Sequence, residues 1–107
     1  MKVPWIPAQA TETLRSYAVD CEFEIRWTGH ARDRMAEREL IMGDVLYVLK
    51  QGVVLNEAQQ ATRSDCYKYE LECSTPNSNG RTVRVVVIPS PDRPAVKVIT
   101  IMWVDGK

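Results

Sequence analysis

The hydrophobic pattern of this 107-residue chain changes its period at Gly52, and this change constrains the fold more than any other feature of the sequence. Before Gly52, apolar residues recur at the spacing of a helix face and predict helices over residues 7–18, 28–39 and 43–51. After Gly52, apolar and polar residues alternate and predict strands over residues 53–56, 66–73, 81–88 and 95–104. The chain is therefore expected to be an α+β protein, with N-terminal helices packed on a three- to four-stranded antiparallel sheet.

Local signals set the expected ends of these elements. Thr28 can cap the second helix, because its hydroxyl can accept a hydrogen bond from a backbone N–H. Gly52 is a natural C-terminal stop for the third helix. Residues 23–27 alternate between apolar and charged side chains, which indicates a short half-buried strand or an extended arm. Residues 74–80 are rich in turn formers, and the prolines of residues 89–92 break the pattern before the last strand.

The length of the chain predicts a single domain over residues 1–107, because domains of about this size are the commonest. We expect residues 1–20 to form an N-terminal helical extension and residues 21–104 to form the core. No apolar run approaches the roughly 20 residues that a membrane helix needs. The first residues lack the apolar core of a signal peptide. A cytoplasmic protein without a membrane partner is therefore expected.

The cysteine and histidine content predicts no metal site. The chain has three cysteines and one histidine, and no two cysteines have the Cys-x-x-Cys spacing of zinc ligands. Reduced, inert thiols in the cytosol are expected instead. We therefore expect no cofactor.

The charge balance limits the class of ligand. Fourteen basic and fourteen acidic side chains give a net charge of zero, which argues against a strong, non-specific binder of polyanions. The positive charge is nevertheless uneven, because the segment 81–97 carries four basic residues and only one acidic residue, Asp92. A local basic patch remains compatible with this composition.

The segment 28–38, TGHARDRMAER, contains the only histidine of the chain. On a helix of about 100° per residue, His30, Arg34 and Glu37 lie within about 60° of one another, with Arg38 close beside them. Guanidinium groups bind phosphate oxygens through two hydrogen bonds, and imidazole is the usual proton-transfer group near pH 7. The positive end of the helix dipole disfavours the imidazolium form of a first-turn histidine. This pattern suits phosphodiester chemistry.

An alternative explanation of this helix needs no function. The arginines and Glu37 could form a solvated face with ion pairs inside the helix, and the histidine could be a packing or capping residue. Ala31 and Met35 form the neighbouring apolar edge, which we expect to dock on the sheet. The sequence alone leaves both explanations open.

The strands offer further candidates. In residues 66–73, Lys68 shares a face with Glu70 and Glu72, opposite Tyr67. A tyrosine or lysine close to His30 could be a second proton-transfer group, although a tyrosine on a sheet is more often part of the core. Both faces of residues 81–88 are largely apolar, so alternation does not decide which face meets the helices. Arg81 at the start of that strand could bind phosphate or simply increase solubility.

The order of these motifs resembles the family called domain of unknown function 4258. The segments that carry the resemblance are GHARDRM (29–35), DVLYVLKQGVV (44–54), CYKYELE (66–72) and TVRVVVIP (82–89). The layout is also similar to that of mRNA interferase toxins of the MqsR and RelE type. That resemblance implies a RelE- or barnase-like fold and a metal-independent endoribonuclease, in which a ribose 2′-hydroxyl attacks the adjacent phosphate. It also implies a cognate antitoxin partner, of the zinc-finger or helix-turn-helix type, that holds the toxin inactive.

The resulting hypothesis is a toxin-like ribonuclease with RNA as its substrate. Its expected catalytic residues are His30, Arg34, Tyr67 and Lys68. Its expected RNA-phosphate-binding residues are Arg38, Arg81 and Arg84. The rival hypothesis is a non-catalytic protein-interaction module of the same fold, favoured by the zero net charge and by Trp5, Trp27 and Trp103 if they are exposed. A nucleic-acid binder without catalysis is a third hypothesis.

Overall fold

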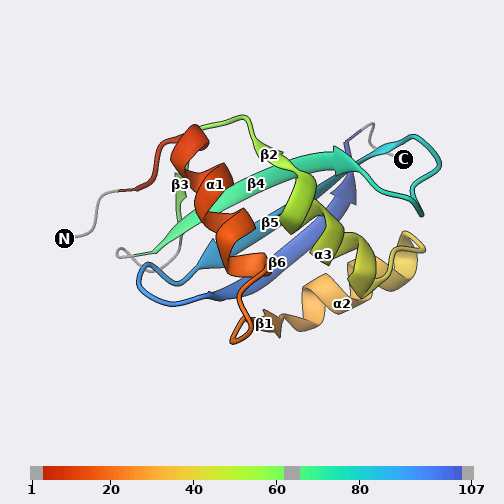
Figure 1. Ribbon diagram of the computed structural model, residues 1–107. Helices are drawn as coiled ribbons and strands as arrows, with labels where there is room; N and C mark the ends of the chain where they lie inside the picture. The colour runs from red at the N-terminus through yellow and green to blue at the C-terminus, as the bar shows by residue number, and fades with distance from the viewer. Residues whose placement is uncertain (1–3, 62–65, 105–107) are drawn as a thin grey trace.

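The computed structural model describes residues 4–61 and 66–104 (Figure 1). Its helices are α1 (Pro7–Ala18), α2 (Gly29–Glu37) and α3 (Met42–Gln51). Its strands are β1 (Glu24–Trp27), β2 (Val53–Val54), β3 (Gln59–Gln60), β4 (Tyr67–Ser74), β5 (Thr82–Pro89) and β6 (Ala95–Trp103). The α+β class is confirmed, and the predicted helices and long strands lie where the hydrophobic pattern put them. The pair of glutamines that forms β3 was not predicted as a strand.

The sheet differs from the expected one in size and in direction. In the described residues it has six strands in the order β1-β6-β5-β4-β2, with β3 paired to β4 outside this path. The expectation of three to four antiparallel strands was therefore wrong. β1 pairs in parallel with β6, with Ile25 opposite Val96 and Trp27 opposite Val98. The short alternating segment before α2 is thus an edge strand of the described sheet, with β6 as its neighbour. It satisfies backbone groups of β6 that would otherwise lack partners.

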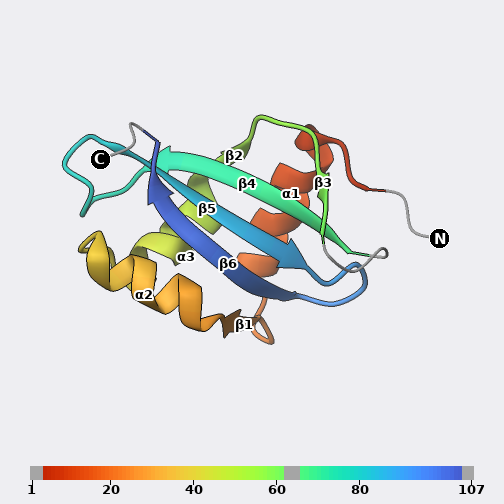
Figure 2. The same cartoon turned by 180° about the vertical axis from the view of Figure 1, so that it is seen from behind.

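The helices lie on one side of the sheet. α1 and α3 cover one face of β4, β5 and β6, and the view from behind shows these strands in front of both helices (Figures 1 and 2). We call the uncovered side of these strands the open face. α2 packs beside β6 through Ala31 and Met35, which are 0% and 6% exposed, so the predicted docking edge is confirmed.

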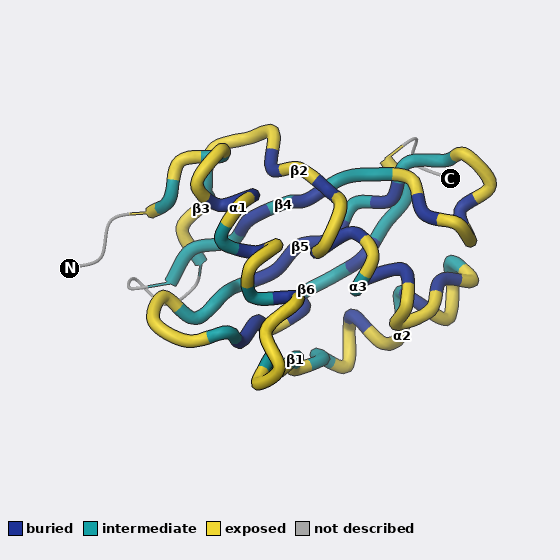
Figure 3. Tube along the Cα trace, in the orientation of Figure 1, coloured by how far each residue is buried: buried dark blue, intermediate teal, exposed yellow. Residues whose placement is uncertain are grey.

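The core lies between the helices and the sheet (Figure 3). Leu14 of α1, Leu49 of α3 and Ile101 of β6 are completely buried in it. On β5, the alternate residues Val83, Val85 and Val87 are also completely buried. Alternation alone did not show which face of this strand meets the helices. The burial of these valines places them on the helix side and Arg84 on the open face.

A buried carboxylate joins α3 to the turn between β4 and β5. Asp44 is 2% exposed, and its oxygens accept hydrogen bonds from the Thr75 hydroxyl at 2.6 Å and from the Asn77 side-chain amide at 3.0 Å. It also accepts a bond from the backbone N–H of Ile41 at 2.9 Å. Burial raises the pKa of Asp44, but these three hydrogen bonds outweigh burial and hold the pKa below its ordinary value.

Replacing Asp44 should therefore destabilise the protein in a pH-dependent way. Asp44→Ala removes three charge-assisted contacts, and we expect it to lower the free energy of unfolding by about 2–3 kcal/mol at pH 7. Because the folded pKa is below the unfolded one, the carboxylate stabilises the fold above its unfolded value of about 4, and this contribution is lost as the pH falls. Urea denaturation between pH 3 and pH 7 measures both effects. Asp33→Ala, which removes an exposed carboxylate, is the control and should change little.

Gly52 should not tolerate a side chain. A Cβ atom at this position would lie 2.5 Å from the Val48 carbonyl oxygen and 3.2 Å from that of Glu72. We expect Gly52→Ala to push α3 away from β4 and to cost about 1–3 kcal/mol, measured by thermal or urea unfolding. At Gly29 a Cβ would meet no atom within 4 Å. Gly29→Ala should leave stability unchanged or slightly higher, and an equal loss at both positions would contradict the steric argument.

Candidate functional site

The start of α2 is fixed to β6. The Thr28 hydroxyl accepts a hydrogen bond from the Ala31 N–H at 3.0 Å, as predicted for a cap, and lies 3.1 Å from the carbonyl oxygens of Val98 and Ile99. His30 is the second residue of the helix and is exposed. The helix therefore presents its imidazole at the surface beside the β6 edge.

Two arginines at the C-terminal end of α2 contact the same glutamate side chain. Arg34 forms an ion pair with Glu37, and the same carboxylate oxygen lies 3.7 Å from Arg38. This matches the intrahelical ion pairs of the non-functional explanation. Two guanidinium groups share one carboxylate, so the cluster keeps a net positive charge.

A hollow at the C-terminal end of α2, which we call the turn hollow, brings together two of the predicted phosphate-binding residues. Its volume is about 570 Å³, and Arg38 and Arg81 both line it. The Arg81 guanidinium carbon lies 3.9 Å from the centre of the Trp103 ring. The remaining lining residues are Glu37, Glu39, Asn77, Ser78 and Asn79. With two carboxylates and two arginines, this hollow has no excess of positive charge for a polyanion.

A second hollow, on the open face, has a different charge. We call it the cationic hollow. It has a volume of about 400 Å³ and is lined by Arg26, Lys68, Lys97, Ala61, Cys66, Ile88 and Ile99. None of these residues is acidic. In residues 4–61 and 66–104, none of the three cations forms an ion pair with a carboxylate.

Strand register explains why these cations meet. Arg26 of β1 lies opposite Lys97 of β6, and Lys97 lies opposite Ile88 of β5. Tyr69 of β4 lies opposite Val87 of β5, and the residues next to them, Lys68 and Ile88, both line the hollow. The three basic residues therefore form one row across the sheet, on strands that are about 4.8 Å apart. The sequence indicated Lys68 as a candidate and included Lys97 in the basic segment 81–97, but it did not indicate that Arg26 meets them, because the parallel pairing of β1 with β6 leaves no local signal.

An adjoining hollow of about 330 Å³ extends this row toward the turn between β5 and β6. It shares Arg26, Cys66, Ile88 and Lys97 with the cationic hollow. The additional charged residues on its wall are Glu24 and Arg93, whose side chains pair with each other at 2.8 Å. This pair neutralises itself, so the excess positive charge stays with the row.

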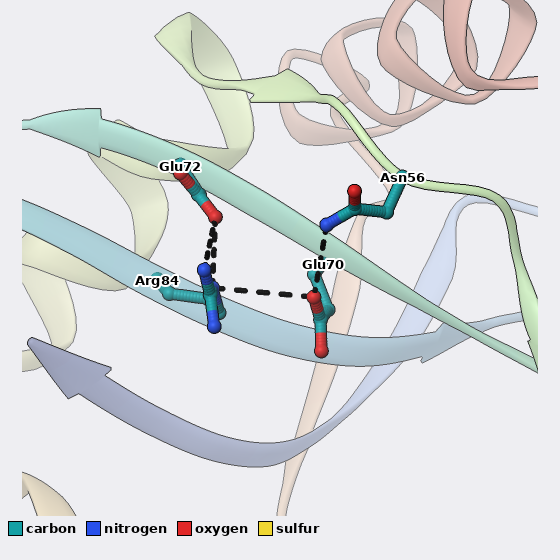
Figure 4. Close-up of polar contacts among 4 residues, drawn as sticks. All are labelled: Asn56, Glu70, Glu72 and Arg84. Carbon is teal, nitrogen blue, oxygen red and sulfur yellow. Dashed lines mark hydrogen bonds and ion pairs between the residues drawn. The ribbon is translucent and has the colours of Figure 1, made fainter. Parts of the chain in front are cut away.

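A set of paired charges lies farther along the open face (Figure 4). The Arg84 guanidinium contacts one oxygen of Glu72 through two nitrogens, at 2.6 and 2.8 Å, and lies 4.0 Å from Glu70. The Asn56 amide also donates to Glu70, at 3.5 Å. Arg84 is therefore already held by a carboxylate and would have to release Glu72 to bind a phosphate.

The structure distributes the predicted residues over several places. His30 and Arg34 lie on the surface of α2, Arg38 and Arg81 line the turn hollow, and Lys68 and Arg84 lie on the open face. Tyr67 is half-buried and packs against the core, on the opposite side of β4 from Lys68. The two neighbouring residues therefore do not face the same site. Among residues 4–61 and 66–104, no group of three or more His, Cys, Asp or Glu side chains could hold a metal ion.

The row of cations should bind small polyanions. We expect 5 mM inorganic tripolyphosphate at low salt to raise the melting temperature by about 2–5 °C through preferential binding to the folded state. Lys68→Gln or Lys97→Gln should remove most of this shift. Neither should lower the melting temperature of the free protein, because removing one cation reduces the repulsion among the cations of the row. Lys50→Gln, an exposed cation on α3, should keep the full shift. An equal loss with Lys50→Gln would mean that the anion binds by net charge alone.

Comparison with known proteins gives a family. The family model for domain of unknown function 4258 matches residues 27–103, which include α2, α3 and every strand from β2 to β6. No curated protein and no solved structure matches the chain. None of the described helices is long and apolar enough to span a membrane. Because the match covers most of the sequence, the chain belongs to the family of domain of unknown function 4258.

Proposed function

We propose that the protein is a toxin-like, metal-independent endoribonuclease that acts on single-stranded RNA. The observation that carries this proposal is the cationic hollow, where Arg26, Lys97 and Lys68 meet and none of the described lining residues is acidic. A chain with no net charge gains little from non-specific attraction, so a local row of cations is a selective way to hold a phosphodiester. The MqsR- and RelE-like layout of the sequence agrees with this assignment.

The lining of the hollow suits a nucleotide strand as well as a phosphate. Ile88 and Ile99 provide an apolar surface between the cations, against which a ribose or a base can pack. Arginine and lysine stabilise the negative charge that develops on the phosphate oxygens during attack by the 2′-hydroxyl. The reaction needs no metal ion, because the nucleophile belongs to the substrate. It leaves a 2′,3′-cyclic phosphate and a 5′-hydroxyl, and DNA lacks the required hydroxyl.

His30 is the proton-transfer group that this proposal places beside the hollow. Only three residues separate it from Arg26, and Thr28 between them contacts the carbonyl oxygen of Ile99, whose side chain lines the hollow. The imidazole is exposed, so a substrate can reach it, and imidazole is a common proton-transfer group in enzymes. Arg34 and Arg38 lie along the same helix and would hold the flanking phosphates of a longer strand.

An assay with purified protein tests the proposal. We expect cleavage of a 5′-labelled single-stranded RNA in 10 mM EDTA, with a cyclic phosphate at the new 3′ end, and no cleavage of DNA of the same sequence. Lys68→Ala and His30→Ala should each reduce the rate by about 100-fold or more. Lys50→Ala, on the helix side, should cut at the wild-type rate. RNA that stays intact, or equal cleavage by all variants, would refute the proposed activity.

The non-catalytic interaction module remains a second candidate, favoured by exposed apolar side chains. The most exposed large ones are Ile6, Val19, Ile41 and Leu55, which are between 59% and 72% accessible. A cognate antitoxin or another protein could cover such residues. Growth arrest on expression that Lys68→Ala relieves would favour the ribonuclease, whereas harmless expression together with intact RNA would favour the interaction module.

A further inference from the structure

We infer that Glu70 is the general base that activates the ribose 2′-hydroxyl, an assignment that rests on the proposed ribonuclease function. Glu70 lies two residues from Lys68 on the same face of β4, so the two Cα atoms are about 6.7 Å apart. In the sheet register, Glu70 lies opposite Val86. It is two residues along β4 from Lys68, which belongs to the row that forms the cationic hollow. A phosphate held by Lys68 would therefore have this carboxylate beside it.

The contacts of Glu70 leave one of its oxygens free to take a proton. Asn56 at 3.5 Å and Arg84 at 4.0 Å both approach Oε1, and both distances are long for a hydrogen bond or an ion pair. In the described part of the chain, Oε2 has no partner. The side chain is 25% exposed, so a ligand on the open face can reach it.

Glu72, on the same face of the same strand, is by contrast held in a short ion pair. One of its oxygens accepts from Nε and from a terminal nitrogen of Arg84, at 2.8 and 2.6 Å, and the side chain is 13% exposed. Arg84 therefore neutralises mainly Glu72 and only orients Glu70. Two glutamates on one face of one strand thus have different chemistry, and Glu72 is a matched control (Figure 4).

Glu70 and His30 lie near opposite ends of the row of cations. Both β5 and β6 lie between β4 and β1, and β1 leads into α2, so about 14 Å separates the backbone of Glu70 from the start of α2. Attacking and leaving oxygens lie on opposite sides of the phosphorus in an in-line attack. Glu70 Oε2 takes the 2′-hydroxyl proton as the bond from the 2′-oxygen to phosphorus forms. The bond from phosphorus to the 5′-oxygen then breaks, and the leaving oxygen receives a proton from His30 as the general acid.

Single-turnover cleavage of labelled RNA in EDTA by wild type, Glu70→Gln and Glu72→Gln tests this role. Affinity is measured separately with 2′-O-methyl RNA of the same sequence, which cannot be cleaved by this route. We expect Glu70→Gln to cut at least about 100-fold more slowly while it binds the 2′-O-methyl strand as tightly as wild type, or more tightly. Glu72→Gln should keep the rate within a few-fold.

The outcomes separate the two proposals. Wild-type cleavage together with undiminished cleavage by Glu70→Gln refutes the base assignment and leaves the ribonuclease function standing. An equal loss of cleavage rate in both variants also refutes it, and so does a lower rate in Glu70→Gln that is matched by weaker binding. Either result indicates a structural or binding role. Intact RNA with every protein refutes the ribonuclease function and this inference with it. Circular dichroism of each variant confirms that the compared proteins are folded.

Discussion

The parallel pairing of β1 with β6 is the interaction on which the rest of this structure depends. It aligns Arg26 with Lys97, and it leads the chain directly into the Thr28 cap that holds α2 against the same strand. β1 and α2 thus follow one another along the edge of β6. Without this pairing, the cationic hollow would lose a wall and His30 would have no fixed relation to the sheet.

The two faces of the sheet divide the work between stability and chemistry. The helix side is apolar and closed, with Leu71, Val85 and Ile101 completely buried. The open face carries the charged residues of these strands, together with apolar residues such as Ile88 and Ile99. Because side chains alternate along a strand, a residue needed for packing and a residue needed for binding can be direct neighbours in sequence. Tyr67 and Lys68 are such a pair.

Local rules predicted the elements, and non-local pairing decided the site. Helical and alternating periods located α1–α3 and the long strands, and the role of Thr28 follows from cap chemistry that involves only nearby residues. Gly52 ends α3 as predicted, but a side chain is excluded there partly by the carbonyl oxygen of Glu72 on β4, a contact that the local sequence does not indicate. The sheet order could not be predicted in the same way, because the partner of β1 lies far along the chain. β3 was invisible, since its two glutamines form a strand only through their pairing with β4.

The same distinction explains the candidate residues. Lys68 could be predicted from its strand, whereas Arg26 and Lys97 gain their meaning only from the register between β1 and β6. Arg84 looked like a free phosphate ligand in the sequence, but the register places Glu72 directly opposite it. Alternation along β4 is by itself enough to put Tyr67 and Lys68 on opposite faces, so one site could not hold both. A sequence therefore identifies which side chains are chemically suitable more readily than which of them meet.

The outer strands of this sheet are short, and this affects how the protein behaves in concentrated solution. β1 has four residues and β2 and β3 have two each, while the strands between them have eight or nine. Exposed backbone N–H and C=O groups on a long edge would recruit strands from other molecules and lead to aggregation. Here β1 and α2 shield one side of the long strands, and β2 and β3 shield parts of the other. The sheet can therefore leave a broad polar face in contact with solvent while it offers other chains little backbone to extend.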